Sequence, residues 1–181
     1  DNAKKLTMFY LDKDKGAIGN IMALGGKYII VKDGENSGFN PFMVESTNEN
    51  LNKLKTLVKM LVTRNGEILT TLEEENLNRA VESVMRFPIE DRQYGISLVL
   101  EHLTEGSDET NSMKSRLNLW KSGNKFGWVF DNAIDNFKFD NDEINIYGID
   151  GTDLLANAEV NSVVSFYILW RIFSVCDGRR Y

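Results

Sequence analysis

The 181-residue sequence is poor in cysteine and histidine, and each shortage narrows what the chain can do. Its single cysteine, Cys176, cannot close an internal disulfide, and its place in an apolar run favours inert core packing in a reducing compartment. Its single histidine, His102, leaves no histidine pair for a metal site. We therefore expect His102 on a helix surface or in the core.

Long apolar runs and an excess of basic residues are also missing. The longest apolar segment, Val163–Cys176, contains Arg171 and is shorter than the ~20 residues of a membrane span, which favours a buried helix. With 27 acidic and 21 basic residues the net charge is −6, so the surface has no general electrostatic footprint for nucleic acid. Direct binding of nucleic acid is therefore not expected, and neither is a signal peptide.

The residues that are present begin with an α/β pattern. Leu6–Leu11 is an apolar run without period-two alternation, which predicts a strand covered on both faces. Ala17–Leu24 has apolar residues at helical spacing and stops at Gly25–Gly26, and Lys27–Val31 is rich in β-favouring residues. This order of strand, helix and strand predicts a βαβ unit, the building block of a mostly parallel sheet.

From Asn48 to Lys121 the pattern changes to four successive helices. In the second of them, Thr71 and Glu74 have the spacing of a capping box. The pattern predicts a helical subdomain, residues 48–121, inserted into an α/β core of residues 1–47 and 122–181. The first helix carries an apolar stripe along one face, formed by Leu51, Leu54, Leu57, Val58, Leu61 and Val62.

Strand-like segments return after these helices. Phe126–Phe130 is aromatic and apolar and predicts a strand. Phe137–Phe139 and Ile144–Tyr147 flank an acidic turn, and this arrangement favours a hairpin. The final helix, about Val160–Val175, is apolar almost all round, as expected of a helix packed against a sheet. The fold class expected for the whole chain is α/β.

Asp12 and Asp14 are the first candidates for chemistry. They follow the first expected strand, and ligands of open α/β sheets bind beyond the carboxyl ends of the strands. A carboxylate at that position can polarise a water for attack on a phosphate, or hold a magnesium-bound water. Aspartate is also common where a strand ends and a helix begins, so spacing alone favours a role in capping the helix from Ala17.

Gly25, Gly26 and Lys27 look like the end of a phosphate-binding loop but do not form one. That loop needs G-x-x-x-x-G-K-[ST], whereas Ile21 stands five residues before Gly26 and Tyr28 follows Lys27. The segment lacks the first glycine and the hydroxyl that binds magnesium. We therefore interpret it as the end of a helix.

Arg179 and Arg180 follow the final expected helix. Cations are favourable there because they complement the helix dipole, and the sequence alone favours this explanation. The functional alternative is a contact with a neighbouring subunit or with its nucleotide, since a guanidinium can stabilise phosphoryl-transfer charge from a second subunit.

Five segments in a fixed order cover nearly the whole chain: DKDKG at 12–16, ALGGKY at 23–28, GFNPF at 38–42, FGWVFDN at 126–132 and DGRR at 177–180. In this order they resemble the middle of the C-terminal ATPase domain of a family of type IV secretion ATPases. The family is subunit four of the VirB series, with conjugation relatives of the TrbE and CagE kind.

The resemblance implies a partial RecA-like fold of the P-loop ATPase class, with the helical subdomain inserted between the two nucleotide-binding motifs. In the family a phosphate-binding loop precedes the first strand, and a Walker B strand ending in Asp-Glu follows the last arginines. Neither is present in this sequence. By the same resemblance the residue that activates water matches Asp14 or Asp12, and Asp14 is the better match because it lies further into the loop.

The resemblance also implies a setting. The intact protein would use ATP and magnesium and form a homo-oligomer, expected to be a hexamer. It would lie peripherally on the cytoplasmic side of the bacterial inner membrane, among other secretion-apparatus subunits. There it would couple ATP hydrolysis to assembly of the apparatus and to transfer of DNA or protein.

The chain itself resembles an excised fragment of such a protein. Because the lysine and hydroxyl of the phosphate-binding loop are missing, we expect the fragment to bind no cofactor tightly and to be catalytically incompetent. The alternative interpretation is a non-catalytic docking module. In that case residues 48–121 bind a secretion partner and the α/β part is a scaffold.

Overall fold

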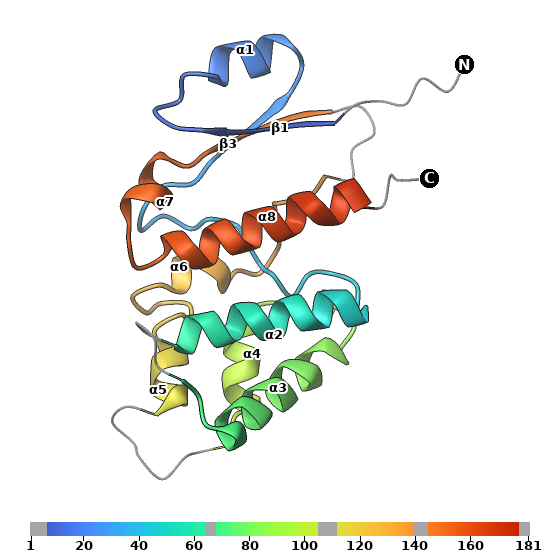
Figure 1. Cartoon of the computed structure of the whole chain (residues 1–181), viewed down its shortest axis with the longest axis vertical. Helices are drawn as coiled ribbons and strands as arrows, with labels where there is room; N and C mark the ends of the chain where they lie inside the picture. The colour runs from blue at the N-terminus through green and yellow to red at the C-terminus, as the bar shows by residue number, and fades with distance from the viewer. Residues whose placement is uncertain (1–6, 64–67, 105–111, 140–144, 178–181) are drawn as a thin grey trace, which may run out of the picture.

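The computed structural model describes residues 7–63, 68–104, 112–139 and 145–177. Three strands form one parallel sheet, and helices lie on both sides of it (Figure 1). The strands are β1 Met8–Asp12, β2 Lys27–Ile30 and β3 Ile146–Asp150, in the spatial order β1-β3-β2. The expected α/β class is confirmed.

The last strand in the sequence, β3, lies in the middle of the sheet. Both β1 and β2 pair with it in parallel, so the hairpin expected between Phe137–Phe139 and Ile144–Tyr147 is wrong. Residues 137–139 form no strand, and the acidic turn lies outside the described residues. Phe137 and Phe139 are buried instead, and the Phe139 ring lies 4.9 Å from that of Tyr147.

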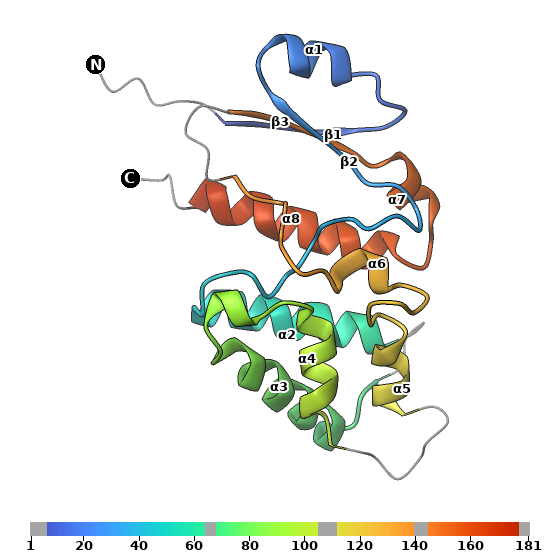
Figure 2. The same ribbon diagram turned by 180° about the vertical axis from the view of Figure 1, so that it is seen from behind.

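Helix α1, Ile18–Ala23, covers one face of the sheet (Figure 2). It can approach because β3 carries Gly148, where a Cβ atom would lie 2.4 Å from the Tyr28 ring and 2.5 Å from the Ile21 side chain. After the helix, Gly25 has a φ of 75°, a left-handed conformation that glycine adopts without strain. The expected end of this helix is confirmed.

Strand β1 is more open than its apolar sequence predicts. Met8, Tyr10 and Leu11 expose 38, 41 and 63% of their surface. Helix α1 packs mainly over β2 and β3, and Met8 and Tyr10 of β1 are partly exposed, while Phe9 on the other face stacks on Tyr147. The expectation of a strand covered on both faces is therefore wrong for the described residues.

Helix α8, Asn161–Asp177, covers the other face and lies between the sheet and helix α2, Asn48–Val62 (Figures 1 and 2). The short helix α7, Thr152–Ala156, leads into it from β3. Val164 and Tyr167 are fully buried, as the all-round apolar sequence predicts. No helix in the described part of the chain has the length and apolar character needed to cross a membrane.

The arginine within this apolar helix has a buried partner. Arg171 forms an ion pair with Asp135, whose side chain is fully buried. Asp135 also accepts a hydrogen bond from the Tyr167 hydroxyl at 2.9 Å. Burial is the main cause that raises the pKa of Tyr167 well above its ordinary value, so this hydroxyl stays a donor.

Below α8, helix α2 packs against two more helices, α3 Thr71–Met85 and α5 Met113–Asn118 (Figure 1). The apolar stripe on α2 is buried as expected except for the partly buried Leu51, and Leu54, Leu57 and Val58 are each 0% exposed. The division of the chain at residues 48 and 121 stays a prediction. The other elements are a short 3-10 helix Ile89–Asp91 and α4 Gly95–His102.

Helix α3 begins with a capping box one residue earlier than predicted. Thr70 accepts the Glu73 N–H at 3.3 Å, and the Glu73 carboxylate accepts the Thr70 N–H at 2.8 Å. Two threonines followed by consecutive glutamates satisfy the spacing in two registers, so the sequence could not decide between them. Glu74 instead forms an ion pair with Lys59 of α2 at 2.7 Å.

The segment expected as a strand at Phe126–Phe130 forms the short helix α6, Gly127–Phe130. Gly127 lies so close to the preceding turn that a Cβ atom would be 2.1 Å from the Lys121 carbonyl oxygen. The Trp120 ring packs 4.7 Å from that of Phe126 and 6.3 Å from that of Phe130. This packing overrides the strand preference of the aromatic residues.

Buried polar side chains join the GFNPF segment to the FGWVFDN segment. The Asn40 amide donates to the carbonyl oxygens of Arg92 at 2.9 Å and Asn132 at 2.8 Å. Asp131 accepts from the N–H and hydroxyl of Ser97, in the first turn of α4. These residues hold the helices onto the α/β part of the chain.

Candidate functional site

The candidate site lies at the carboxyl end of the parallel sheet. There the last residues of β1 and β3, Asp12 and Asp150, are direct partners in the strand register. Beyond them the loop after β1 meets the start of α7, and the Gly151 N–H donates to the Asp12 carbonyl oxygen at 2.8 Å. We call Asp12, Asp14, Lys15, Asp150 and Thr152 the strand-end cluster.

Asp12 is engaged in local structure. Its Oδ2 accepts the Tyr28 hydroxyl at 2.6 Å and the Ala17 N–H, just before α1, at 2.8 Å. The Tyr28 hydrogen bond is the largest cause that lowers the pKa of Asp12, and the Ala17 hydrogen bond is the next. Burial, and then Asp12 itself, raise the pKa of Tyr28, so its hydroxyl remains the donor. Asp12 therefore ties the end of β1 to Tyr28 of β2 and to the residue just before α1.

Asp14 is engaged through its backbone. Asp14 and Lys15 have φ angles of 64° and 59°, in the left-handed region that residues other than glycine rarely adopt. The Asp14 N–H donates to the Thr152 hydroxyl oxygen at 2.8 Å. Its exposed carboxylate makes no hydrogen bond or ion pair with any residue that the structure describes. It is therefore available to a ligand.

Asp150 and Thr152 are members of the cluster that the sequence did not reveal. Asp150 is 2% exposed, and its Oδ1 accepts the Thr152 N–H at 3.0 Å and the Thr152 hydroxyl at 2.5 Å. Its Oδ2 lies 3.6 Å from the Lys15 ammonium. The D-x-T spacing indicates such a turn, but it could not indicate that the turn meets a loop from the start of the chain.

An apolar pocket of about 200 Å³ adjoins the cluster between the sheet and α8. Asp12 and Ser165 contribute polar groups to its wall. Leu11 and Leu169, which are 63 and 42% exposed, lie at its edge. The strand-end cluster thus has an apolar surface on its α8 side.

The other residues singled out in the sequence lie elsewhere. Lys27 begins β2 and its ammonium donates to the Asn136 carbonyl oxygen at 3.4 Å, so it belongs to the start of a strand. His102 is exposed at the end of α4, with its ring 5.8 Å from that of Phe87. Arg179 and Arg180 lie outside the described residues. Within the described ranges, no three His, Cys, Asp or Glu side chains are grouped to hold a metal ion.

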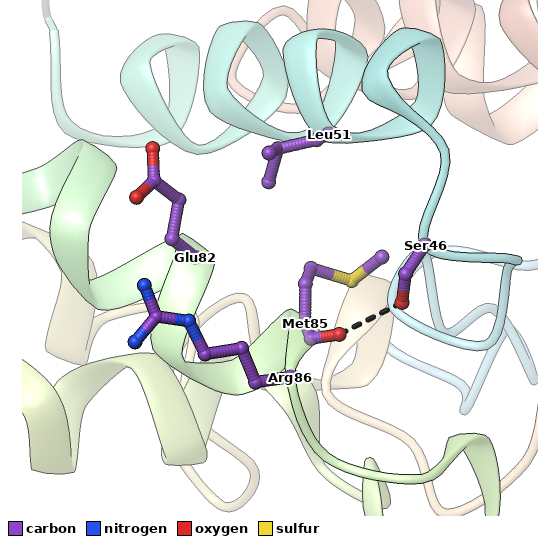
Figure 3. A pocket seen from close by; sticks show the side chains of 5 residues that line it. All are labelled: Ser46, Leu51, Glu82, Met85 and Arg86. Atoms are coloured by element: carbon purple, nitrogen blue, oxygen red, sulfur yellow. Dashed lines mark hydrogen bonds between the residues drawn. The ribbon is translucent and has the colours of Figure 1, made fainter.

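A second pocket, of about 230 Å³, lies between α2 and α3 (Figure 3). Leu51 points into it from α2 and Met85 from α3, while the Ser46 hydroxyl donates to the Met85 carbonyl oxygen at 2.7 Å. Glu82 and Arg86 extend from α3 at its side. The pocket therefore has an apolar base and charges of both signs.

The parallel sheet and the helices on both its faces are those of an α/β domain, the class to which the expected RecA-like fold belongs. A solved structure supports this class: VirB4 of Thermoanaerobacter pseudethanolicus matches with a TM-score of 0.68 at 15% identity, over 97% of this chain and 71% of that one. No protein-family model matches the chain.

Curated relatives identify the family. The type IV secretion system protein VirB4 of Brucella abortus (strain 2308) is 43% identical over 182 residues, which is 95% of this chain and 21% of the relative. PtlC of Bordetella pertussis, also a type IV secretion system protein, is 37% identical over 99% of this chain and 22% of the relative. The chain belongs to the VirB4 family of type IV secretion system proteins and spans about a fifth of the length of these relatives.

Proposed function

We propose that this chain is part of the nucleotide-binding domain of a type IV secretion ATPase. The intact protein hydrolyses ATP and couples hydrolysis to assembly of the apparatus and to transfer of DNA or protein. One observation carries the proposal: the exposed Asp14 carboxylate stands beyond the carboxyl end of a parallel strand in a RecA-like fold. Ligands of such sheets bind at this edge.

Asp14 is assigned the role of positioning the attacking water. A carboxylate can accept a proton from that water or orient it for attack on the terminal phosphate. Asp12, whose oxygen is shared between Tyr28 and Ala17, holds the loop that presents Asp14. We give Asp12 the structural role because its carboxylate already accepts two hydrogen bonds, and Asp14 the role at the water because its carboxylate has no partner among the described residues.

ATP and magnesium fit this chain only in part. Magnesium prefers oxygen ligands and usually keeps several waters, and the strand-end carboxylates suit a hydrogen bond to such a magnesium-bound water. However, the sequence holds no G-x-x-x-x-G-K-[ST] segment to cradle phosphates. The phosphate-binding residues therefore belong to other parts of the parent protein, and we expect the isolated chain to show no magnesium-dependent ATP turnover. Turnover by the pure isolated chain would contradict this.

The direct test is Asp14→Asn in the full-length protein. We expect ATP turnover to fall by about 100-fold or more, the range for losing a positioned proton acceptor, while the affinity for ATP stays close to that of the wild type. Single-turnover hydrolysis and equilibrium nucleotide binding separate the two quantities. Turnover at the wild-type rate would exclude this role for Asp14.

The relatives, which are named as type IV secretion system proteins, support the part of the proposed setting that concerns the secretion apparatus. The parent forms a homo-oligomer, expected to be a hexamer, with other secretion-apparatus subunits as partners. It lies peripherally on the cytoplasmic face of the bacterial inner membrane. Arg179 and Arg180 are candidates for contacts between its subunits. Sedimentation of the full-length protein with and without ATP tests the oligomeric state.

A docking role for the helices is the second candidate. The pocket between α2 and α3 supports it, because an apolar base beside Glu82 and Arg86 suits a protein segment (Figure 3). The coding sequence on either side of this chain distinguishes the two functions. A G-x-x-x-x-G-K-[ST] segment upstream and an apolar strand ending in Asp-Glu downstream support the ATPase, and their absence supports the docking module.

A further inference from the structure

The loop that presents Asp14 contains two consecutive left-handed residues. Asp14 and Lys15 have φ angles of 64° and 59°, and neither is a glycine. For residues with a Cβ atom this conformation is unfavourable, and it persists only where surrounding structure holds it. The loop therefore needs contacts from outside itself.

Both left-handed residues are held from the same place, the corner between β3 and α7. The Asp14 N–H donates to the Thr152 hydroxyl oxygen at 2.8 Å. The Lys15 ammonium lies 3.6 Å from the Asp150 carboxylate. Asp150 and Thr152 come from a segment far along the sequence, so the conformation of the Asp14 loop depends on tertiary structure.

Asp150 determines which way the Thr152 hydroxyl points. An ionised carboxylate can only accept hydrogen bonds, so the single hydroxyl proton of Thr152 is directed to Asp150 Oδ1, at 2.5 Å. The Thr152 N–H donates to the same oxygen at 3.0 Å, which fixes the side chain relative to the carboxylate. The lone pairs of the hydroxyl are then left to accept the Asp14 N–H.

We propose that Thr152, oriented by Asp150, is a positioning residue that holds the Asp14–Lys15 turn so that the Asp14 carboxylate meets the attacking water. This role rests on the proposed function of Asp14. Thr152 acts only through the Asp14 backbone and does not touch the nucleotide. Hydrolysis therefore depends on a hydroxyl at position 152 and not on the methyl group of threonine.

The test compares Thr152→Val and Thr152→Ser in the full-length protein. Valine keeps the shape but removes the hydroxyl, whereas serine keeps both of its hydrogen bonds. In Thr152→Val we expect about tenfold faster hydrogen exchange in the peptide containing the Asp14 amide. We also expect kcat to fall by about tenfold, with the KM for ATP little changed. Thr152→Ser restores both values to within about threefold of the wild type.

Thr47→Val is the matched control. Thr47 Oγ1 also accepts one backbone N–H, that of Asn50 at 3.1 Å, but it caps α2, in the helical part of the chain. We expect this variant to lose stability without changing exchange at Asp14 or kcat. Thr152→Ala replaces Thr152→Val if the valine variant does not fold, because it also removes the hydroxyl.

The outcomes separate this inference from the proposed function. Wild-type exchange at Asp14 or wild-type kcat in Thr152→Val would overturn the positioning role, and so would a serine variant as impaired as valine. Wild-type turnover in Asp14→Asn would instead remove the role of Asp14 itself. In that case Thr152→Val would still accelerate exchange at Asp14, so the two failures give different data.

Discussion

The apolar side chains of the helical region are more completely buried than those of strand β1 in the sheet. Leu54, Leu57 and Val58 on α2 are completely buried, whereas Tyr10 and Leu11 on β1 expose 41 and 63% of their surface. The helices are closed by local caps and apolar stripes. In the sheet, strand β1 is partly exposed to solvent, and charged residues lie at the carboxyl ends of β1 and β3.

This difference indicates where stability and chemistry lie. Burial of apolar surface is the main source of folding free energy, so the α2 and α3 interior should dominate stability. Groups that meet a ligand must remain accessible, and Asp14 is exposed at the open end of the sheet. Substitutions in the two regions should therefore affect different properties.

The largest expected effect on stability is in the helical region. Leu57→Ala should lower the free energy of unfolding by about 2–5 kcal/mol, because it leaves a cavity around a side chain that is 0% exposed. The same substitution at Leu11 should change it by no more than about 0.5 kcal/mol. Urea unfolding of both variants measures the contrast. Equal losses would break the proposed distinction between the regions.

A smaller effect tests the register of the α3 cap. Thr70→Ala should cost about 0.5–2 kcal/mol, because Thr70 accepts the Glu73 N–H. Thr71→Ala should change the free energy of unfolding by no more than about 0.5 kcal/mol, since the capping hydrogen bonds are made by Thr70 and not by Thr71. Thermal unfolding of the two variants distinguishes the registers. A larger loss at Thr71 would favour the register expected from the sequence.

The smallest effect concerns protonation of Asp12. Its lowered pKa means that its contacts add stability above the ordinary carboxyl pKa, and that this stability is lost as the pH falls through the folded pKa. Tyr28→Phe removes the largest cause, so the pKa of Asp12 should rise and its contribution to acid sensitivity should shrink. Carboxyl titration by NMR measures the shift. Tyr10→Phe is the control and should leave the pKa of Asp12 unchanged.

The sequence predicts the helices better than the sheet. The apolar stripe of α2 and the all-round apolar pattern of α8 predict the buried helices because helical periodicity depends on neighbours in the sequence. The pairing of β3 with β1 and β2 joins the two ends of the chain, and no local signal specifies it. The expected hairpin was wrong for this reason, whereas the strand expected at Phe126–Phe130 was wrong because packing against Trp120 overrides the strand preference of its aromatic residues.

Of the five residues in the strand-end cluster, the sequence singled out Asp12 and Asp14. Asp12 and Asp14 could be chosen because they follow an apolar strand, the position where α/β proteins bind ligands. Asp150 and Thr152 could not, because their importance depends on the strand order that brings β3 beside β1. The resemblance favoured Asp14 over Asp12 because of its place in the loop. The structure adds that Asp12 accepts a hydrogen bond from the hydroxyl of Tyr28, which lies in another strand.

The most direct test of this account measures unfolding and ATP turnover in the full-length protein for Asp12→Asn and Asp14→Asn. Asp12→Asn should lower the unfolding temperature, because Asp12 anchors Tyr28 and the start of α1. Asp14→Asn should unfold like the wild type yet lose about 100-fold or more of its turnover. Wild-type turnover in Asp14→Asn, with turnover lost and stability kept in Asp12→Asn, would contradict the account.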